Sequence, residues 1–582
     1  MSRPFALATA LLLASSTALA DGSCDLHYRV KPRYDSTPRR LDVELSFPAE
    51  GRRESWLRLQ PGWAGIKDFG VALAPAPDQQ AGVRLLPGDN VNRWKVEHGP
   101  EGRVSVSYQV RSALDDSDDG KVQSQEQLYR AQVGANWFQF FGYGVLTSVE
   151  AWGDMRSGRM CLTLMQADGE AAPLLGSYFD GQAHARADAE LQGTHALLRH
   201  AFYAGGSGWR IMERTLPGGM VVTGSRGKHA LEDTRFADQV AQLLEVHRRF
   251  WGDSGSPRQT VVRTPNNSPN NNGGTLVHET AVLHVSQNFG PSNESFEFLI
   301  GHENLHQWFP SRLGGRESGS VEQAAQHYWL SEGFTDYYTH RLLLAGGLWT
   351  LDRYAGLLTR TLRGYWRSPA RNATAESIAP RFFSDRDAGR QMYARGEILA
   401  MGWDRELRAK SPAGLDGLVR SLLLPDKQAA EAEVARERVL KALTNELGPR
   451  PREQVRAHVA EGRSFELDEN LAGPCFSLGW NDVPRWVLGF DMNSLSSGAN
   501  KASGVVVDGP AYQAGLRENM ALKGWSVFGG DTAKEVVLEV KTEDGDKELR
   551  YLPVDGSGDR LPTLAVRPGA SADAACQAWI RR

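Results

Sequence analysis

The stretch His302-Glu303-Asn304-Leu305-His306 predicts a helix that presents two imidazoles and one carboxylate to a single metal ion. Residues four apart on a helix share a face, with Cβ atoms roughly 5–6 Å apart, so both histidines can reach the same ion. Zinc held by neutral imidazoles keeps a position for water and lowers the pKa of that water toward about 7. Glu303 lies beside the histidines, where its carboxylate can accept the proton.

The flanking sequence favours a helix at this place. Ser292 or Asn293 can cap its first turn, and Pro310 is expected to end it. The five-residue pattern also arises by chance, so it predicts a zinc site only together with this context. Apolar residues between the two ends recur at helical spacing, at Phe298, Leu299, Leu305, Trp308 and Phe309.

A third protein ligand is required, and Glu332 is the candidate. Two other carboxylates, Glu317 and Glu322, lie between His306 and Glu332. The first of these lies in a glycine-rich loop, and the second begins a polar stretch. Glu332 instead lies in the aromatic-rich segment 328–338, where a carboxylate is unfavourable unless a cation compensates it. It completes the predicted ligand set of one zinc ion per chain.

Asp336 follows Glu332 by one helical turn and lies on the same face. It can accept the free ring N–H of His302 or His306, which would fix the tautomer of that ring. The alternative is a solvated acidic residue at the edge of the helix.

Three motifs together resemble the glycyl aminopeptidase family of gluzincin metallopeptidases. They are His302-Glu303-x-x-His306-x-Trp308, the run Trp329-x-x-Glu332-Gly333-Phe334-Thr335-x-Tyr337-Tyr338, and the step Tyr393-x-Arg395-Gly396. The resemblance covers nearly the whole mature chain. It implies a multidomain α+β fold with an N-terminal β-sandwich, a thermolysin-like α/β catalytic domain with a helical lobe, and a C-terminal PDZ domain.

The resemblance also implies a role for Tyr393. In that family a tyrosine before a Lys/Arg-Gly step donates a hydrogen bond to the oxyanion formed during peptide hydrolysis. A phenolic O–H aimed at developing negative charge stabilises the transition state more than the ground state. Without the resemblance, Tyr393 would be read as a core or surface tyrosine of its helix.

The segment Gly273-Gly274-Thr275-Leu276-Val277-His278-Glu279 departs from the family pattern Gly-Gly-Leu-Glu-His, which holds the amino end of the substrate. Gly273 and Gly274 let the backbone approach a bound peptide closely. Glu279 is the candidate for the displaced carboxylate, but strand alternation would face it away from His278. The simpler interpretation is the end of an Asn-rich loop followed by an edge strand.

The first residues have the pattern of a secretory signal peptide, with Arg3, an apolar stretch from Phe5 to Leu13 and small residues up to Ala20. Residues 1–20 are therefore predicted to be removed before Asp21, and the mature protein is predicted to be periplasmic or secreted. No later stretch offers the roughly 18 apolar residues of a membrane span.

Four cysteines allow three pairings in an oxidising compartment. Their positions favour Cys24 with Cys161 and Cys475 with Cys576, because each pair would bracket one proposed domain. No two of them are close enough in sequence to favour zinc ligation.

The charge of the chain is ordinary for a soluble enzyme, with 66 basic and 70 acidic residues and a formal net charge of −4. There is no basic excess or basic tract to attract nucleic acid. There is also no polybasic amphipathic helix to hold a membrane.

The patterning of the chain predicts three domains after the signal peptide. Residues 21–190 hold short alternating runs, such as 41–47 and 104–110, typical of a β domain. Residues 195–460 predict the zinc catalytic domain, which becomes mainly helical after Ser331. Its expected elements are strands at 209–212, 220–223, 260–263 and 281–285 and a helix at 232–251.

Residues 470–582 predict the PDZ domain. Within them, Trp486-Val487-Leu488-Gly489-Phe490 resembles the carboxylate-binding loop and strand of such domains. PDZ domains bind extended peptides by adding a strand, with backbone N–H groups holding the terminal carboxylate. The alternative is a purely structural domain that recruits no peptide.

Together these observations predict an exported zinc-dependent peptidase, and the resemblance favours an aminopeptidase. One alternative keeps the zinc chemistry in an endopeptidase or oligopeptidase, because the altered segment from Gly273 to Glu279 weakens the argument for amine capture. The other is a non-catalytic, PDZ-containing peptide-binding protein of the cell envelope. Glu303 and Tyr393 speak against it, because binding alone needs neither.

Overall fold

The structure is a computed structural model that describes most of the chain. The predicted signal peptide, residues 1–20, lies outside the described residues. The described ranges are 24–115, 122, 124–153, 156–167, 169–252, 257–266, 272–291, 293, 295–315, 321–425, 428–429, 432–495, 500–543 and 545–581. The chain divides into two compact units, one with residues 1–349 and 373–463 and the other with residues 350–372 and 464–581.

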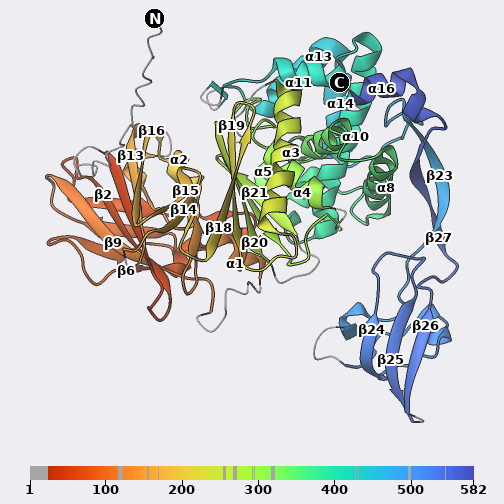
Figure 1. Ribbon diagram of the computed structural model, residues 1–582, viewed down its shortest axis with the longest axis horizontal. Coiled ribbons are helices and arrows are strands. Elements are labelled where there is room, and N and C mark those ends of the chain that lie inside the picture. Colours follow the sequence, from red (N-terminus) through yellow and green to blue (C-terminus); the bar gives the residue numbers. More distant parts are fainter. Residues whose placement is uncertain are drawn as a thin grey trace, which may run out of the picture. The chain divides into compact units, whose positions relative to one another are not determined.

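The N-terminal part of the first unit is built from β-sheets, as predicted (Figure 1). The predicted alternating runs lie in neighbouring antiparallel strands, and every second side chain of each run is buried in one hydrophobic core. One sheet has the order β16-β13-β1-β2-β9-β6. Its strands are β1 (Leu26–Arg33), β2 (Arg40–Pro48), β6 (Leu73–Pro75), β9 (Arg103–Arg111), β13 (Ser157–Met165) and β16 (Arg186–Thr194).

Two further sheets and a small hairpin complete this part, in the orders β10-β11-β17-β14-β15, β12-β3-β8-β7 and β4-β5. Their strands are β3 (Glu54–Arg58), β4 (Gly62–Trp63), β5 (Ile66–Lys67), β7 (Arg84–Pro87), β8 (Arg93–Glu97), β10 (Gln132–Val133), β11 (Phe138–Phe141), β12 (Ser148–Val149), β14 (Ala172–Gly176), β15 (Phe179–His184) and β17 (Phe202–Gly205). Short helices α1 (Gln125–Tyr129) and α2 (Ala196–Arg199) lie between strands.

A mixed sheet begins the catalytic part, in the order β18-β19-β20-β22-β21. The predicted strands and helix are all present. The central strands β19, β20 and β22 run parallel, and the edge strand β21 pairs antiparallel with β22. The elements are β18 (Trp209–Leu216), β19 (Gly219–Arg226), α3 (Asp233–Trp251), β20 (Arg258–Pro265), β21 (Gly273–Val277) and β22 (Thr280–Val285).

The rest of the first unit is mainly helical, as predicted. In Figure 1 these helices run from yellow-green to cyan and follow the mixed sheet in the chain. They are α4 (Phe296–Leu305), α5 (Val321–Ala325), α6 (Tyr328–Ser331), α7 (Gly333–Ala345), α9 (Ala375–Ile378), α10 (Arg386–Lys410), α11 (Gly414–Ser421), α13 (Ala435–Leu447) and α14 (Arg450–Gln454). Among the described helices, none has the length and hydropathy needed to cross a membrane.

The second unit combines a helix from the middle of the chain with the C-terminal residues. Helix α8 (Leu351–Arg367) packs on β27 (Gly558–Val566), which pairs along its length with β23 (Phe476–Pro484). A smaller sheet of β24 (Ala521–Ser526), β25 (Val536–Thr542) and β26 (Gly545–Tyr551), with helix α15 (Pro510–Gln513), has its own core. Residues 486–490, predicted as a loop and strand, form no strand. The chain ends in α16 (Ala574–Ile580).

Both favoured cysteine pairings are present as disulfides. Cys24 with Cys161 joins the start of β1 to its parallel neighbour β13 in the first unit. Cys475 with Cys576 joins the start of β23 to α16 in the second unit. Each bridge therefore lies within one compact unit.

Candidate metal centre

Helix α4 brings the two predicted histidine ligands onto one face. His302 lies inside the helix, and His306 is its C-terminal cap. The cap residue has φ −58° and ψ −13°, so it keeps helical backbone geometry. The two rings are perpendicular, and their centroids lie 4.8 Å apart.

The ends of α4 differ from the prediction. Its N-cap is Ser295, whereas the sequence predicted Ser292 or Asn293. Ser292 lies outside the described residues. The Asn293 side chain instead accepts hydrogen bonds from the backbone and the hydroxyl of Ser295. At the other end the helix stops at Leu305, before Pro310, because the chain turns tightly through the intervening residues.

Glu332 reaches the site from a different part of the chain, at the junction of α6 and α7. A close contact at Gly396 positions the junction that holds Glu332. A Cβ on Gly396 of α10 would lie 1.7 Å from the carbonyl oxygen of Trp329 and 2.9 Å from the Cα of Gly333. Helix α10 therefore passes this junction at backbone contact distance, which glycine alone permits.

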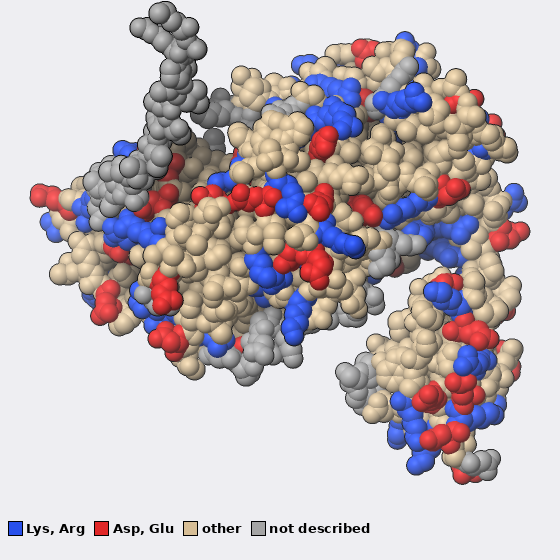
Figure 2. All heavy atoms as spheres, in the orientation of Figure 1, with Lys and Arg blue, Asp and Glu red and all other residues tan. Residues whose placement is uncertain are grey.

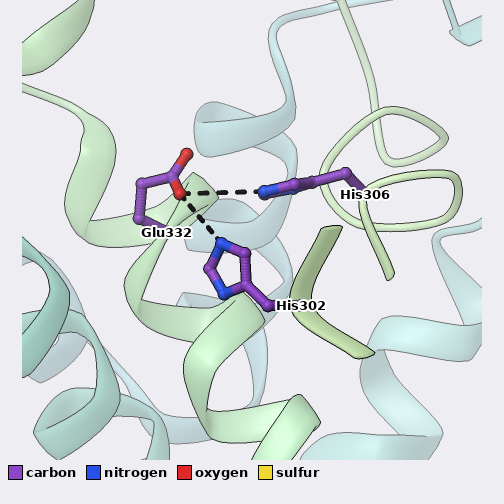
Figure 3. A group of neighbouring side chains, drawn as sticks. All are labelled: His302, His306 and Glu332. Atoms are coloured by element: carbon purple, nitrogen blue, oxygen red, sulfur yellow. Dashed lines mark hydrogen bonds and ion pairs between the residues drawn. The ribbon is translucent and has the colours of Figure 1, made fainter. Parts of the chain in front are cut away.

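The three predicted ligands converge, as Figure 3 shows. Nε2 of His302 lies 3.2 Å from one carboxylate oxygen of Glu332, and Nε2 of His306 lies 3.7 Å from the same oxygen. One ligand atom from each residue falls within 4.8 Å of the others. Of the alternatives weighed from the sequence, Glu317 and the side chain of Glu322 lie outside the described residues.

The second nitrogen of each ring has its own acceptor. Nδ1 of His302 lies 2.8 Å from Oδ1 of Asp336, at an angle less favourable than that of an ideal hydrogen bond. Nδ1 of His306 donates to the carbonyl oxygen of Phe309 at 3.1 Å. With an acceptor at each Nδ1, both rings direct Nε2 at Glu332, and Nε2 is the nitrogen that a metal ion would take. Asp336 therefore lies where the sequence predicted it.

The electrostatics of the cluster favour a cation at its centre. Burial lowers the pKa of His302, but the carboxylates of Asp336 and Glu332 outweigh burial and raise it. Burial raises the pKa of Glu332, but the rings of His306 and His302 outweigh burial and lower it. Two imidazoles and one carboxylate are also a donor set that zinc prefers. The residues present therefore fit a zinc ion.

Glu303 is buried beside the histidines, with 7% of its surface exposed. A Cβ on Gly274 of β21 would lie 2.8 Å from Cγ and 3.0 Å from Cδ of Glu303, so the glycine leaves room for this side chain. Burial raises the pKa of the Glu303 carboxyl, and the neighbouring histidines oppose the rise. A carboxylate in such surroundings has a greater affinity for a proton than one in water.

Helix α10 places Tyr393 next to the same cluster. Its ring centroid lies 6.2 Å from that of His302, and the ring stacks on Phe382 with the two centroids 6.1 Å apart. Burial and the negative charge of Glu332 raise the pKa of Tyr393 well above its ordinary value. The phenol therefore stays protonated at neutral pH and can donate a hydrogen bond.

The predicted substrate-binding segment is only partly brought to the site. Gly274 reaches the cluster, whereas a Cβ on Gly273 would meet nothing within 4 Å. Glu279 and His278 form the turn between β21 and β22, at the far end of β21 from Gly274. The structure does not bring Glu279 to the cluster, because the strand ends before it and alternation no longer applies.

A buried pair behind the cluster was missed from the sequence. Nδ1 of His340 on α7 lies 2.5 Å from Oε1 of Glu397 on α10. His340 follows Asp336, and Glu397 follows Tyr393, each by one helical turn. This spacing was the available signal, because residues four apart on a helix share a face.

The N-terminal sheets also approach the site. Gly65, in the turn of the β4-β5 hairpin, lies against Phe383, and a Cβ there would be 2.8 Å from Cβ of Phe383. The next residue toward the N terminus, Phe382, stacks on Tyr393. The hairpin therefore lies at the edge of the candidate metal centre.

The segment that contains this cluster matches a known protein family. Residues 295–394 match the family model of the M61 glycyl aminopeptidases. That range contains His302, Glu303, His306, Glu332 and Tyr393. The protein is a zinc metallopeptidase.

The peptidase also resembles solved structures. An aminopeptidase N family protein from Idiomarina loihiensis is 18% identical to it, with a TM-score of 0.69, and the match covers 95% of this chain and 100% of that chain. The two proteins therefore share a fold. An M1 zinc metallopeptidase from Deinococcus radiodurans is 14% identical, over 76% of this chain and 94% of that chain, with a TM-score of 0.47. No curated protein sequence matches the peptidase.

Proposed function

We propose that the chain is an exported aminopeptidase that holds one zinc ion with His302, His306 and Glu332. The observation that carries the proposal is the convergence of these three ligand atoms within 4.8 Å, next to the buried carboxylate of Glu303. Zinc bound there would polarise the scissile carbonyl and make water a nucleophile at neutral pH.

The protein groups around the ion supply the proton transfers. Glu303 accepts the proton of the attacking water and donates it to the leaving amine, a role suited to a carboxyl whose pKa is raised by burial. The hydroxyl of Tyr393 donates a hydrogen bond to the carbonyl oxygen as negative charge develops on it. Asp336 holds the Nδ1 proton of His302, so that Nε2 stays free for the metal.

Action on a chain end is supported by the surroundings of the site. The β4-β5 hairpin lies against Phe383, whose neighbour Phe382 stacks on Tyr393. In this proposal the hairpin closes one side of the substrate path, which would favour action on the end of a peptide. Gly274 lets the edge strand β21 lie close to Glu303, where a bound peptide backbone could pair with it.

Paired peptides with free and N-acetylated amino ends test this function. The free peptides should be shortened from the amino end, the acetylated ones should lose most of the rate, and a zinc chelator should stop both reactions. Mass spectrometry of the products reads the cleavage positions. Equal rates on both sets would favour an endopeptidase or oligopeptidase. Stoichiometric zinc without any hydrolysis would favour a non-catalytic binding protein.

Export is supported by two features of the chain. The first 20 residues have the pattern of a signal peptide, and all four cysteines are paired in disulfides. Disulfides persist in the periplasm or outside the cell, where conditions are oxidising.

On the face of the molecule that Figure 2 shows, acidic and basic residues are interspersed, and no broad basic surface for nucleic acid is seen on that face.

We further propose that residues 470–582 act as a PDZ domain that binds a peptide carboxylate. Among the described residues, the backbone N–H groups of Leu488, Gly489 and Phe490 have no hydrogen-bond partner, whereas those of Val487 and Asp491 bond to backbone carbonyls. Three consecutive free N–H groups make an anion-binding concavity. A fluorescent peptide with a free C terminus should bind, and its C-terminal amide should bind at least about tenfold more weakly. Equal binding of the two would contradict carboxylate capture.

A further inference from the structure

Behind the candidate metal centre lies a buried His–Glu pair that the proposed mechanism does not use. His340 and Glu397 are in contact at 2.5 Å, and their side chains are 5% and 1% exposed. Stability alone does not account for such a pair, because desolvating two charges offsets most of their attraction. An apolar pair of similar volume would serve the core equally well.

Asp336 connects the pair to a proposed metal ligand. It precedes His340 by one turn of α7, and its Oδ1 lies 2.8 Å from Nδ1 of His302. Burial lowers the pKa of His340, but the carboxylates of Glu397 and Asp336 outweigh burial and raise it. His340 therefore contacts the carboxyl group of Glu397 and lies one helical turn from Asp336, which is next to the ring of His302.

Packing makes a second connection. The ring of Phe298 on α4 contacts two histidines, with its centroid 5.8 Å from that of His302 and 4.8 Å from that of His340. The ring of Trp349 also packs on His340, with the two ring centroids 5.6 Å apart. A shift of the His340 ring would therefore move Phe298 and, through it, the ring of His302.

We propose that His340 and Glu397 are positioning residues for zinc. Through Phe298 they hold the ring of His302 against Asp336, in the orientation in which Nε2 of His302 faces the ion. Partners behind metal-bound histidines affect metal affinity in this way, because they fix the tautomer and the direction of the ring. The inference rests on the proposed zinc site, and its test reads zinc binding rather than peptide hydrolysis.

Zinc affinity of the whole mature protein, measured by competition with a chelator of known affinity, tests this role. His340→Gln and Glu397→Gln are each expected to weaken zinc binding by about 10–100-fold. The double variant should lose little more than either single variant, because the two residues act as one unit. Cobalt substitution gives a second readout, since a turned His302 ring would change the visible absorption spectrum of the bound cobalt.

His247→Gln is the matched control. His247 is a buried histidine beneath the same helix α4, edge-on to Trp308, and neither ring nitrogen has a hydrogen-bond partner among the described residues. It should keep the zinc affinity of the natural chain. If either glutamine variant fails to fold, a variant with leucine at both positions takes its place in the zinc-affinity measurement. Apolar replacements of buried charged pairs are tolerated by the fold.

The outcomes separate the inference from the proposed function. A natural chain that binds no zinc would defeat the proposed function itself. A natural chain that binds zinc, with folded His340 and Glu397 variants of equal affinity and unchanged cobalt spectra, would overturn only the positioning role. An equal loss in the His247 variant would also overturn it, because packing beneath α4 would then explain the effect.

Discussion

A Glu303→Gln variant is expected to bind zinc as the natural chain does and to hydrolyse peptides about 10²–10⁴-fold more slowly. The amide keeps the shape of the side chain but cannot accept a proton from water. Zinc binding should persist, because the converging ligand atoms belong to His302, His306 and Glu332. Steady-state rates on a free peptide and metal content by elemental analysis are the two measurements.

Two further variants sharpen this experiment. Glu297→Gln removes a carboxylate from the first turn of the same helix and should leave the rate unchanged. Tyr393→Phe removes only the hydroxyl and should lower kcat by about 10²–10³-fold, the effect of losing one oxyanion donor. Full activity of the Glu303 variant with zinc bound would rule out the assigned proton transfer.

A Gly396→Ala variant is expected to lose both stability and zinc. The new Cβ would lie 1.7 Å from the carbonyl oxygen of Trp329, a backbone atom that cannot rotate away. Helix α10 would have to move from the α6-α7 junction, at an expected loss of about 3 kcal/mol or more in the free energy of unfolding. Because Glu332 lies at that junction and Tyr393 lies one turn before Gly396, the movement would also pull the site apart.

Gly402→Ala on the same helix is the control for this prediction. A Cβ at Gly402 would meet nothing within 4 Å, so alanine there should stabilise the helix by up to about 1 kcal/mol. Thermal unfolding and zinc content of both variants make the comparison. A Gly396 variant that is as stable as the Gly402 variant and retains zinc would show that the close contact does not set the site.

The sequence correctly predicted the parts of the fold that depend on local patterns. Strands β2 and β9 alternate in burial as their residues alternate in polarity, and helix α3, from Asp233 to Trp251, matches the helix predicted at 232–251. The predicted ends of α4 were wrong. The helix begins after Ser295 and stops at Leu305, and both ends are set by backbone hydrogen bonds that several residue types can make. Helix α8 joins the C-terminal unit, a contact between distant segments that no local pattern signals.

The spacing of His302 and His306 by itself determined that their rings would share a face, because helix geometry is fixed within one turn. The tertiary structure decided the rest. It brought Glu332 to both rings through the Gly396 contact, placed Gly274 rather than Glu279 beside Glu303, and buried Glu397 against His340. Each of these joins segments far apart in the chain, and such contacts depend on how whole helices and strands pack.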